Sequence, residues 1–317
     1  MRGLWLEDRR LRVRDDLPVP EPPPGEARIR VTVAGLCHTD LELVRGYYPY
    51  AGVLGHEFVG VVDRAPSDPA WEGRRVVGEI NATCGACPTC LAGRSSHCER
   101  RTVLGIVRRD GAFADYLTLP LANLHAVPDS VPDDVAVFTE PVAAAFQILA
   151  QLRVGPGDRV VVFGDGKLGQ VIAQVVATTG CGLTVAGRHP HKLAHLAARG
   201  IATQVDPPAL RSADVVVDCT GRREGLQAAL AALRPRGTLV LKSTFAGDTA
   251  LNLSAIVVDE ITIVGSRCGP FAPALAALAS GAVVVSRLIE ARLPLADAVD
   301  AVTRAGSPGT LKVLLVP

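Results

Sequence analysis

The 317-residue sequence lacks the features that would place a protein in a membrane, outside the cell or on nucleic acid. Its formal net charge is only +1, so neither a nucleic-acid footprint nor an acidic tail is implied. The first residues, Met1 to Asp8, are charged almost at once and contain no signal-peptide core. The most apolar stretch, Leu168 to Val185, is interrupted by glutamines and glycines, which favours a buried helix and strand over a membrane span. These absences predict a cytoplasmic protein that binds neither membranes nor nucleic acid.

Internal repeats and low-complexity segments are also absent. What is present is enough apolar material for sizeable cores, because hydrophobic residues make up 48% of the chain and the mean hydropathy is +0.27. The length allows two domains. Eight cysteines in a reducing compartment indicate metal or thiol roles rather than cross-links.

The texture of the sequence changes near residue 140. Before that point, short β-branched runs such as 27–33, 58–62 and 74–77 are cut by Gly and Pro, which predicts a mostly-β domain. After it, apolar strand-like and helix-like segments alternate from 141 to 264. Such alternation predicts an α/β domain in which helices cover both faces of a parallel sheet. We expect the last fifty or so residues, with a strand-like end at 312–316, to return to the first domain.

Four cysteines form a ladder with the spacing C-x2-C-x2-C-x7-C, at Cys84, Cys87, Cys90 and Cys98. Four thiolates this close together can form a tetrahedral Zn–S4 site that has no open position, as in structural zinc sites. A disulfide cluster would suit a small secreted chain better than this one. Coincidental thiols remain a simple alternative, and an iron–sulfur cluster is the main chemical competitor.

Residues 164–169 read Gly-Asp-Gly-Lys-Leu-Gly, a G-x-G-x-x-G pattern between a predicted strand and a predicted helix. In that context the glycines Gly164, Gly166 and Gly169 permit a tight turn, close approach of a pyrophosphate and close helix packing. Lys167 and Leu168 would lie at the helix N-terminus, where free N–H groups favour anions. An ordinary turn between a strand and a helix is the alternative.

The next predicted strand ends without the Asp or Glu that usually bonds the ribose hydroxyls of NAD. Gly187 stands there instead, followed by Arg188, whose guanidinium suits a 2′-phosphate. His189 and Lys192 add further donors. The pattern favours NADP(H) over NAD(H), whereas the simple alternative is a solvated polar turn.

Several motifs together resemble the zinc-dependent medium-chain alcohol/polyol dehydrogenases, in the branch of the threonine, sorbitol and sugar dehydrogenases. The matching segments, which follow in the order of that family, are Gly35–Asp40, Gly55–Gly60, the cysteine ladder, Asp110–Tyr116, Thr139–Pro141 and the Gly164–Gly169 fingerprint. The resemblance implies a GroES-like catalytic domain at 1–140 and 269–317, with a structural zinc lobe at about 81–100. It implies a doubly wound Rossmann domain at 141–268.

The resemblance also implies a catalytic zinc bound by Cys37 and His56, with Glu140 or Glu57 as the carboxylate. A thiolate, an imidazole and one carboxylate would leave a fourth position for substrate. Asp40 is then expected to orient His56, and Thr39 to relay the proton.

Each of these residues also has an ordinary structural interpretation. Cys37 would be a buried thiol, His56 a satisfied loop histidine and Glu140 a carboxylate stabilised by a helix N-terminus.

Other expectations concern the proton path and the cofactor. Glu42 stands where many relatives carry a histidine as the outer proton carrier, so it is a candidate carrier or a solvated surface residue. Lys312 resembles a basic contact to the pyrophosphate, with an exposed lysine as the alternative. Thr220 and Arg267 are further expected cofactor contacts.

The sequence thus predicts a zinc-dependent oxidoreductase with two zinc ions per chain that transfers a hydride between an alcohol or polyol and NADP(H). We expect a homodimer or homotetramer. A zinc-free quinone or enone reductase of the same superfamily and a non-catalytic NADP-binding protein are the rivals. With aromatic residues at only 4%, the sequence gives no basis for choosing among sugars, polyols, amino alcohols and simple alcohols.

Overall fold

The computed structural model describes residues 1–205, 209–243 and 249–317. The chain divides into two compact units, Met1–Glu140 with Leu288–Pro317, and Pro141–Arg287. We expected the chain to return to the first domain at residue 269, but the division falls at Leu288. Residues 269–287 stay with the second unit because they bond to it: the Gln174 amide donates to Val284 O (3.0 Å) and the Arg199 guanidinium to Ala282 O (2.9 Å).

The first unit is built on a seven-stranded sheet with the order β10-β6-β5-β3-β18-β17, and β9 pairs with β3 off this path. Smaller sheets have the orders β2-β1-β4 and β7-β8. Its strands are β1 (Gly3–Glu7), β2 (Arg10–Arg14), β3 (Glu26–Gly35), β4 (Gly52–Val53), β5 (Glu57–Arg64), β6 (Arg75–Gly78), β7 (Asn81–Ala82), β8 (Thr102–Val103), β9 (Tyr116–Pro120), β10 (Leu124–Ala126), β17 (Ile289–Pro294) and β18 (Lys312–Val316). Its helices are α1 (His38–Arg45), α2 (Pro88–Leu91), α3 (Asp133–Ala136) and α10 (Ala298–Ala305).

Strand β3 is the centre of this unit, because it pairs with β5, β9 and β18. Its side chains alternate along the strand, and Ala27, Ile29 and Val31 are buried, as expected for a sheet with one face on the core. The strand is followed at once by α1, whose last turn ends at Gly46 with a left-handed φ of 92°. A glycine adopts this backbone conformation without strain. The residues between β3 and α1 are held at one end of the sheet, because Gly35 pairs with Leu314 and Leu36 N donates to Val313 O at 3.0 Å.

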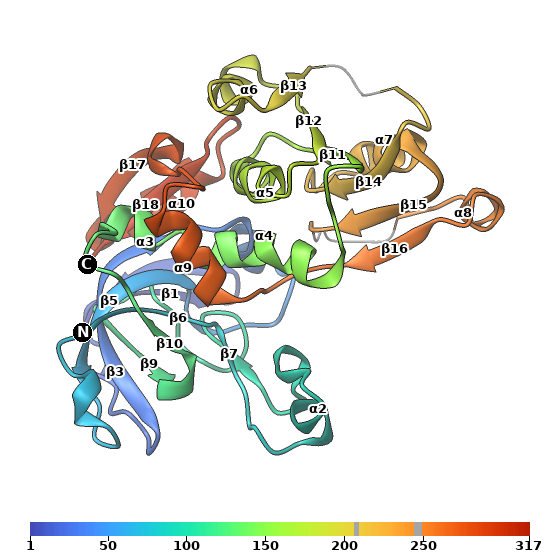
Figure 1. Cartoon of the computed structure of the whole chain (residues 1–317). Coiled ribbons are helices and arrows are strands. Elements are labelled where there is room, and N and C mark those ends of the chain that lie inside the picture. The colour runs from blue at the N-terminus through green and yellow to red at the C-terminus, as the bar shows by residue number, and fades with distance from the viewer. Residues whose placement is uncertain (206–208, 244–248) are drawn as a thin grey trace. The chain divides into compact units, whose positions relative to one another are not determined.

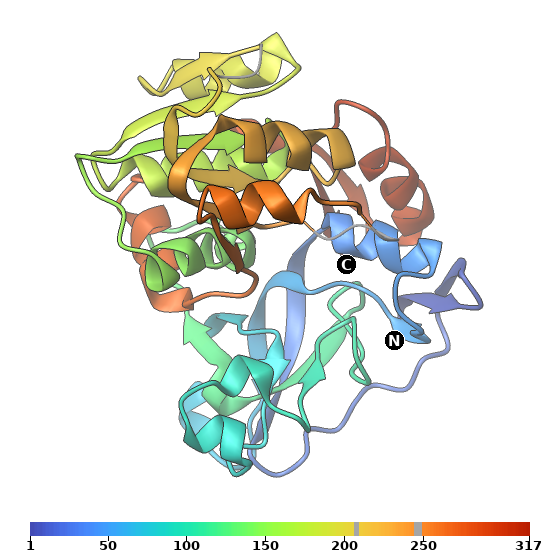
Figure 2. The same ribbon diagram turned by 90° about the vertical axis from the view of Figure 1, so that its right-hand side faces the viewer.

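The segment that carries the four cysteines forms a small lobe of the first unit. It contains α2 and lies between β7 and β8, which pair with each other. The lobe, blue-green in Figure 1, lies apart from the strands β3, β5 and β6, and in Figure 2 it faces the viewer in front of the strands of the first unit. The lobe thus leaves and rejoins the rest of the unit through the short paired strands β7 and β8.

The second unit is a six-stranded parallel sheet with the order β13-β12-β11-β14-β15-β16. The chain starts in the middle at β11, moves outward to β13, and then crosses to β14 and continues to β16, which is the doubly wound order of a dinucleotide-binding fold. Its strands are β11 (Arg159–Phe163), β12 (Gly182–Ala186), β13 (Ala202–Gln204), β14 (Ala213–Asp218), β15 (Leu233–Leu241) and β16 (Thr262–Gly265). Its helices are α5 (Lys167–Ala177), α6 (Pro190–Ala197), α7 (Arg223–Ala232), α8 (Leu253–Val258) and α9 (Phe271–Ala279), and α4 (Thr139–Gln151) leads into it.

This architecture confirms the expected fold class, a mostly-β unit and a doubly wound α/β unit. Valines on β11 and β14 are buried on both faces of the sheet, as the continuous apolar runs in the sequence predict. In the described part of the chain, no helix is long and apolar enough to span a membrane.

Candidate metal and cofactor sites

Cys37, His56 and Glu57 form a compact group of metal-ligating side chains in the first unit. One ligand atom from each of the three lies within 4.8 Å of the other two. His56 and Glu57 are buried, with exposed fractions of 3% and 1%, and Cys37 is half-buried. Buried donors of this kind without a ligand are costly, so their convergence indicates a cation site.

The pairing of β3 with β5 brings these residues together. Gly35, the last residue of β3, lies opposite Glu57, the first residue of β5. Cys37 follows Gly35 by two residues and His56 directly precedes Glu57, so the register puts both ligands at the same end of the sheet. A Cβ on Gly35 would lie 2.5 Å from Glu57 Oε2, and only a glycine there leaves room for this carboxylate.

Asp40 connects the two metal-ligating segments. Its Oδ2 accepts the backbone N–H of Cys37 at 2.8 Å at the start of α1, and its Oδ1 lies 3.1 Å from His56 Nδ1. This arrangement leaves His56 Nε2 as the ring atom for a metal. Burial alone would lower the pKa of His56, but the neighbouring Asp40 carboxylate and Cys37 sulfur raise it well above its usual value. An environment that stabilises a proton on this ring also stabilises a metal cation beside it.

Lys312 lies behind this group rather than on the surface. It is 1% exposed, and its Nζ pairs with the Glu57 carboxylate and donates to Leu36 O at 3.3 Å. The Nζ also lies 5.2 Å from the centre of the Phe138 ring, within cation–π range. This burial contradicts the alternative of an exposed lysine. The contact of Lys312 with the pyrophosphate stays a prediction, and it would require Lys312 to leave Glu57. The sequence carried no signal for this pair, whose members come from β5 and β18.

Thr39 and Glu42 lie on α1, next to the metal-ligating group. Thr39 is half-buried, and its Oγ1 lies 3.8 Å from Cys37 Sγ. Glu42 is 7% exposed and its Oε1 accepts from Arg45 at 2.6 Å and lies 3.3 Å from His38 Nε2. These two partners favour a role for Glu42 in fixing the helix over a role as a free proton carrier.

Glu140 lies in the first turn of α4 and is half-buried. Among the described residues, it is not a member of the three-residue group within 4.8 Å, in which the carboxylate is that of Glu57. Both carboxylates that the sequence offered as ligands are thus in the first unit, one within the group and one outside it.

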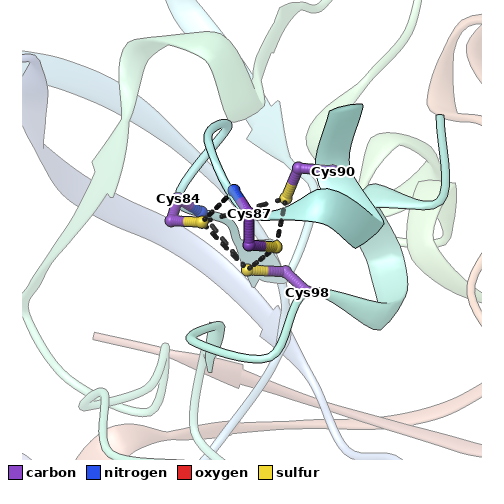
Figure 3. A group of neighbouring side chains, drawn as sticks. All are labelled: Cys84, Cys87, Cys90 and Cys98. Atoms are coloured by element: carbon purple, nitrogen blue, oxygen red, sulfur yellow. Dashed lines mark hydrogen bonds between the residues drawn. The ribbon is translucent and has the colours of Figure 1, made fainter. Parts of the chain in front are cut away.

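The four cysteines of the lobe converge, as Figure 3 shows. Four of the Sγ–Sγ distances are 3.5 Å for Cys87–Cys90 and Cys84–Cys98, 3.8 Å for Cys87–Cys98 and 4.0 Å for Cys84–Cys90. Four sulfurs at about 2.3 Å from a tetrahedral zinc lie roughly 3.8 Å apart, so the spacing fits a single ion. A disulfide needs about 2.05 Å between sulfurs, which excludes the disulfide alternative for this arrangement.

Polar groups around the lobe stabilise the thiolates of Cys84 and Cys87, but not that of Cys90. The backbone N–H groups of Cys84 and Cys87 donate to sulfurs at 3.5 and 3.4 Å, and the Arg100 guanidinium donates to Cys84 Sγ at 3.3 Å. Donation from the backbone N–H of Ala86 leads the causes that lower the pKa of Cys84 to about 6, whereas burial raises the pKa of Cys90 to about 12. Metal binding would deprotonate all four, because the thiolate is the ligand.

The glycine fingerprint of the second unit adopts the conformation that phosphate-binding loops require. Gly164 has a φ of +121°, and a Cβ on Gly169 would overlap the carbonyl oxygen of Gly164. Gly166, which caps α5, has open space where its Cβ would be. Lys167 and Leu168 follow as the first, half-buried residues of α5. This loop would therefore place a pyrophosphate at the N-terminus of α5, where backbone N–H groups and the helix dipole favour anions.

The end of β12 carries the residues that we expected at the ribose. Gly187 is buried, Arg188 is exposed and His189 is half-buried, whereas Lys192 is buried at 4% exposure. A residue that the sequence pattern does not mark as a contact lies among them: Asp165 of the fingerprint accepts hydrogen bonds from both Arg188 N and His189 N.

Thr220 and Arg267 follow strands β14 and β16 of the second unit. The Thr220 hydroxyl donates to Asp218 Oδ1 at 2.7 Å, and Arg267 is exposed. Lys242, which no sequence motif marks, fixes this end of the sheet, since its Nζ donates to Ala144 O at 2.6 Å and to Arg267 O at 2.9 Å.

Comparisons with known proteins agree with both units. Residues 23–129 match the family "Alcohol dehydrogenase GroES-like domain" and residues 168–282 match the family "Zinc-binding dehydrogenase". A sorbitol dehydrogenase of Halalkalibacterium halodurans is 31% identical over 323 residues, covering 94% of this chain and 94% of the relative. The chain belongs to the zinc-binding, GroES-like alcohol dehydrogenase family. The resemblance inferred from the motifs is thereby confirmed.

Solved structures of other dehydrogenases have the same fold. A zinc-binding dehydrogenase from Sinorhizobium meliloti 1021, bound to NADP, has a TM-score of 0.90 and 28% identity, with 100% of this chain and 99% of that chain covered. An alcohol dehydrogenase from Escherichia coli CFT073, in complex with NADH, has a TM-score of 0.91 and 27% identity over 100% and 99% of the two chains. The fold thus accommodates either nicotinamide cofactor.

This dehydrogenase is accordingly an oxidoreductase that transfers a hydride between an alcohol or polyol and NAD(P). Its residues fit the groups that this chemistry needs: two clusters of sulfur, nitrogen and oxygen ligands are compatible with zinc, and an open glycine loop fits a dinucleotide.

Proposed function

We propose that this dehydrogenase prefers NADP(H), acts on polyols or sugar-derived alcohols, and holds two zinc ions per chain. The observation that carries the proposal is the group of Cys37, His56 and Glu57, whose ligand atoms lie within 4.8 Å of one another and whose histidine is oriented by Asp40. A purely structural site would fill all four positions, as the cysteine lobe does, whereas this group leaves one open.

The chain's own residues bind the metal and move the proton in this proposal. Cys37 and His56 hold the zinc, and Asp40 keeps the His56 ring in the required tautomer. Zinc, when bound, supplies Lewis acidity that lowers the pKa of the substrate hydroxyl and so favours hydride transfer to the nicotinamide. The Thr39 hydroxyl accepts the substrate proton and donates its own toward solvent. Because Glu42 is held by Arg45 and His38, we assign it to the support of α1.

Two carboxylates compete for the third ligand position. Glu57 is supported by its place in the ligand group, but it already has an ion-pair partner in Lys312. Glu140 is supported by the resemblance to polyol dehydrogenases. Cobalt-substituted Glu57→Gln and Glu140→Gln variants would separate the two, because only loss of a direct ligand changes the visible d–d spectrum.

The preference for NADP(H) is supported by the residues at the end of β12. Gly187 provides no carboxylate for the ribose hydroxyls, and the exposed Arg188 provides a guanidinium for a 2′-phosphate. The expected result is a higher kcat/KM with NADP⁺ than with NAD⁺, and loss of that advantage in Arg188→Ala. A clearly higher kcat/KM with NAD⁺, with NADP⁺ use unchanged by Arg188→Ala, would contradict this preference.

A screen of oxidation rates over polyols, sugar acids, amino alcohols and simple alcohols tests the substrate class. The sorbitol dehydrogenase relative supports the polyols. We expect the highest kcat/KM for a polyol or sugar-derived secondary alcohol, and a preference for simple primary alcohols would refute the assignment.

Zinc content separates this proposal from its rivals. Metal analysis of the purified protein should give about two zinc ions per chain, one for each ligand group. A value near one, without dehydrogenase activity on any of these alcohols, would favour a zinc-free reductase or a non-catalytic protein.

Self-association into a homodimer or homotetramer is supported by the edge of the second unit's sheet. Strand β16 is an edge strand with Ile263 partly exposed, and the adjacent α8 exposes Val257 and Val258 at 74% and 79%. An unpaired strand beside apolar side chains is a favourable surface for a second copy. Sedimentation equilibrium should therefore give the mass of a dimer or a tetramer of the 33.2 kDa chain, and the mass of a monomer at micromolar concentration would contradict the proposal.

A further inference from the structure

The space beside Gly187 is filled by the carboxylate of Asp165. A Cβ placed on Gly187 would lie 2.6 Å from both Cβ and Oδ2 of Asp165, closer than real Cβ contacts. Asp165 belongs to the fingerprint loop after β11, whereas Gly187 ends β12, the neighbouring strand. The glycine at the position that usually selects the cofactor is thus required by a side chain from another loop.

The Asp165 carboxylate is buried, at 6% exposure, and it is fully engaged. Its Oδ2 accepts Arg188 N at 2.7 Å and His189 N at 2.6 Å, and its Oδ1 lies 3.0 Å from His189 Nδ1. Burial by itself would raise the pKa of Asp165, but its bonds to His189 and Arg188 lower it. The carboxylate is therefore occupied with the turn and is not available to ribose hydroxyls.

The contacts with Asp165 do not use the Arg188 guanidinium or the Nε2 atom of His189. In the part of the chain that the structure describes, the Arg188 guanidinium makes no hydrogen bond or ion pair, and the residue is exposed. With Nδ1 facing Asp165, the His189 ring keeps Nε2 for another partner, and the His191 ring is edge-on to it with centroids 5.8 Å apart. A turn whose backbone is already fixed loses less entropy when its side chains bind an anion.

We infer that Asp165 is a positioning residue that selects NADP(H): it fixes the turn of Arg188 and His189 for a 2′-phosphate and occupies the space of an acid at residue 187. This inference rests on the proposed cofactor preference and adds a residue that acts through its neighbours. It also predicts that an acid cannot be introduced at residue 187 while Asp165 is present.

Dissociation constants for NADP⁺, NAD⁺, 2′,5′-ADP and 5′-AMP, measured by calorimetry on the full-length zinc-loaded protein, test the inference. Asp165→Ala removes the acceptor of both N–H groups, and it should weaken NADP⁺ and 2′,5′-ADP by about tenfold or more. NAD⁺ and 5′-AMP should change by less than about twofold in the same variant. A matched control is Asp158→Asn, because Asp158 likewise accepts a backbone N–H, that of Gly155 at 2.8 Å, in a turn of the same unit.

Equal weakening of all four ligands in Asp165→Ala would reduce Asp165 to a structural role and overturn the inference, as would no weakening at all. Should Asp165→Ala fail to fold, the isosteric Asp165→Asn replaces it, with the same selective loss expected in smaller measure. Arg188→Ala distinguishes a failure of the proposed cofactor preference from a failure of the positioning role of Asp165. If it spares NADP⁺ binding, the proposed preference is wrong, whereas a selective loss there without one in the Asp165 variants refutes only the positioning role.

A pair of variants tests the exclusion of an acid from residue 187. Gly187→Asp alone should weaken both NADP⁺ and NAD⁺, because the new side chain collides with Asp165. Asp165→Gly combined with Gly187→Asp removes the collision, and it should bind NAD⁺ more tightly than NADP⁺. If Gly187→Asp alone already produces tight NAD⁺ binding, Asp165 does not exclude an acid from residue 187.

Discussion

The two groups of metal-ligating residues in the first unit are assembled in different ways. The four cysteines of the lobe come from one short segment, and their sulfurs fill a tetrahedron. Cys37, His56 and Glu57 come from two segments that meet only because β3 pairs with β5. Local ligands close a site completely, whereas ligands held by a sheet can leave one position open. In the proposed function, this difference separates a structural zinc site from a catalytic one.

Cys37→Ser should give the largest loss of activity, because it removes a ligand from the three-residue group that leaves one position open. Removal of the thiolate ligand should lower kcat by about 10³-fold or more, because Lewis-acid assistance amounts to several kcal/mol. Zinc content should fall by about one ion per chain. Cys181→Ser, at a half-buried cysteine outside both groups, is the control. Full turnover with both zinc ions retained would refute the assignment of Cys37 as a ligand of the catalytic zinc.

Cys84→Ser changes the four-cysteine lobe, and it should affect folding rather than catalysis. Loss of one of four ligands, and of the Arg100 contact at 3.3 Å, should lower the free energy of unfolding. We expect a loss of about 4 kcal/mol, since metal binding is coupled to folding. Thermal unfolding with metal analysis measures it, and kcat per folded molecule should stay within about twofold. A loss of kcat as large as that in Cys37→Ser, with unchanged stability, would reverse the two roles.

Asp40→Asn should sharpen the comparison, because the lobe has no equivalent of Asp40. Asn keeps an acceptor for Cys37 N but loses the charge that faces His56. Zinc affinity at the open site should fall by about 10- to 100-fold, as measured by competition with a chelator. Asp68→Asn is the matched control, since Asp68 caps a short helix by accepting Ala70 N at 3.3 Å. Equal affinities in the two variants would remove Asp40 from the metal site.

Glu42→Gln should have the smallest effect. Its ion pairs join a buried carboxylate to the exposed side chains of Arg45 and His38, and pairs with such exposed partners contribute about 1 kcal/mol or less. We expect kcat to change by about threefold at most, with an unchanged pH profile. A pH profile that loses one ionisation in this variant would make Glu42 the outer proton carrier after all.

Much of the molecule could be read from local patterns. The strands around 27–33, 159–163 and 312–316 were expected from β-branched runs, and the glycine fingerprint was expected between a strand and a helix. The cysteine ladder was recognisable because all four ligands lie within one loop. In each case the signal is short in sequence and the physical requirement is local: burial of alternate side chains, a turn with positive φ, or closure of a small ring.

Pairs of residues from distant elements could not be read in this way. Lys312 was expected at the pyrophosphate, yet β18 and β5 bring its Nζ to Glu57. The sequence does not predict a role for Asp165, because nothing in the motif indicates that its carboxylate fills the space beside Gly187. The end of the second unit was also misplaced, since 269–287 is retained by bonds to Gln174 and Arg199.

The sequence by itself determined the two kinds of fold unit, the four-sulfur site and the dinucleotide loop, because each depends on neighbours along the chain. The tertiary structure alone decided which carboxylate lies beside Cys37 and His56, that Lys312 is buried with it, and that the Asp165 carboxylate fills the space beside Gly187. Those outcomes depend on strand register and side-chain packing, which join residues far apart in the chain. Charges buried there need partners, and only the packed fold determines which partner each one finds.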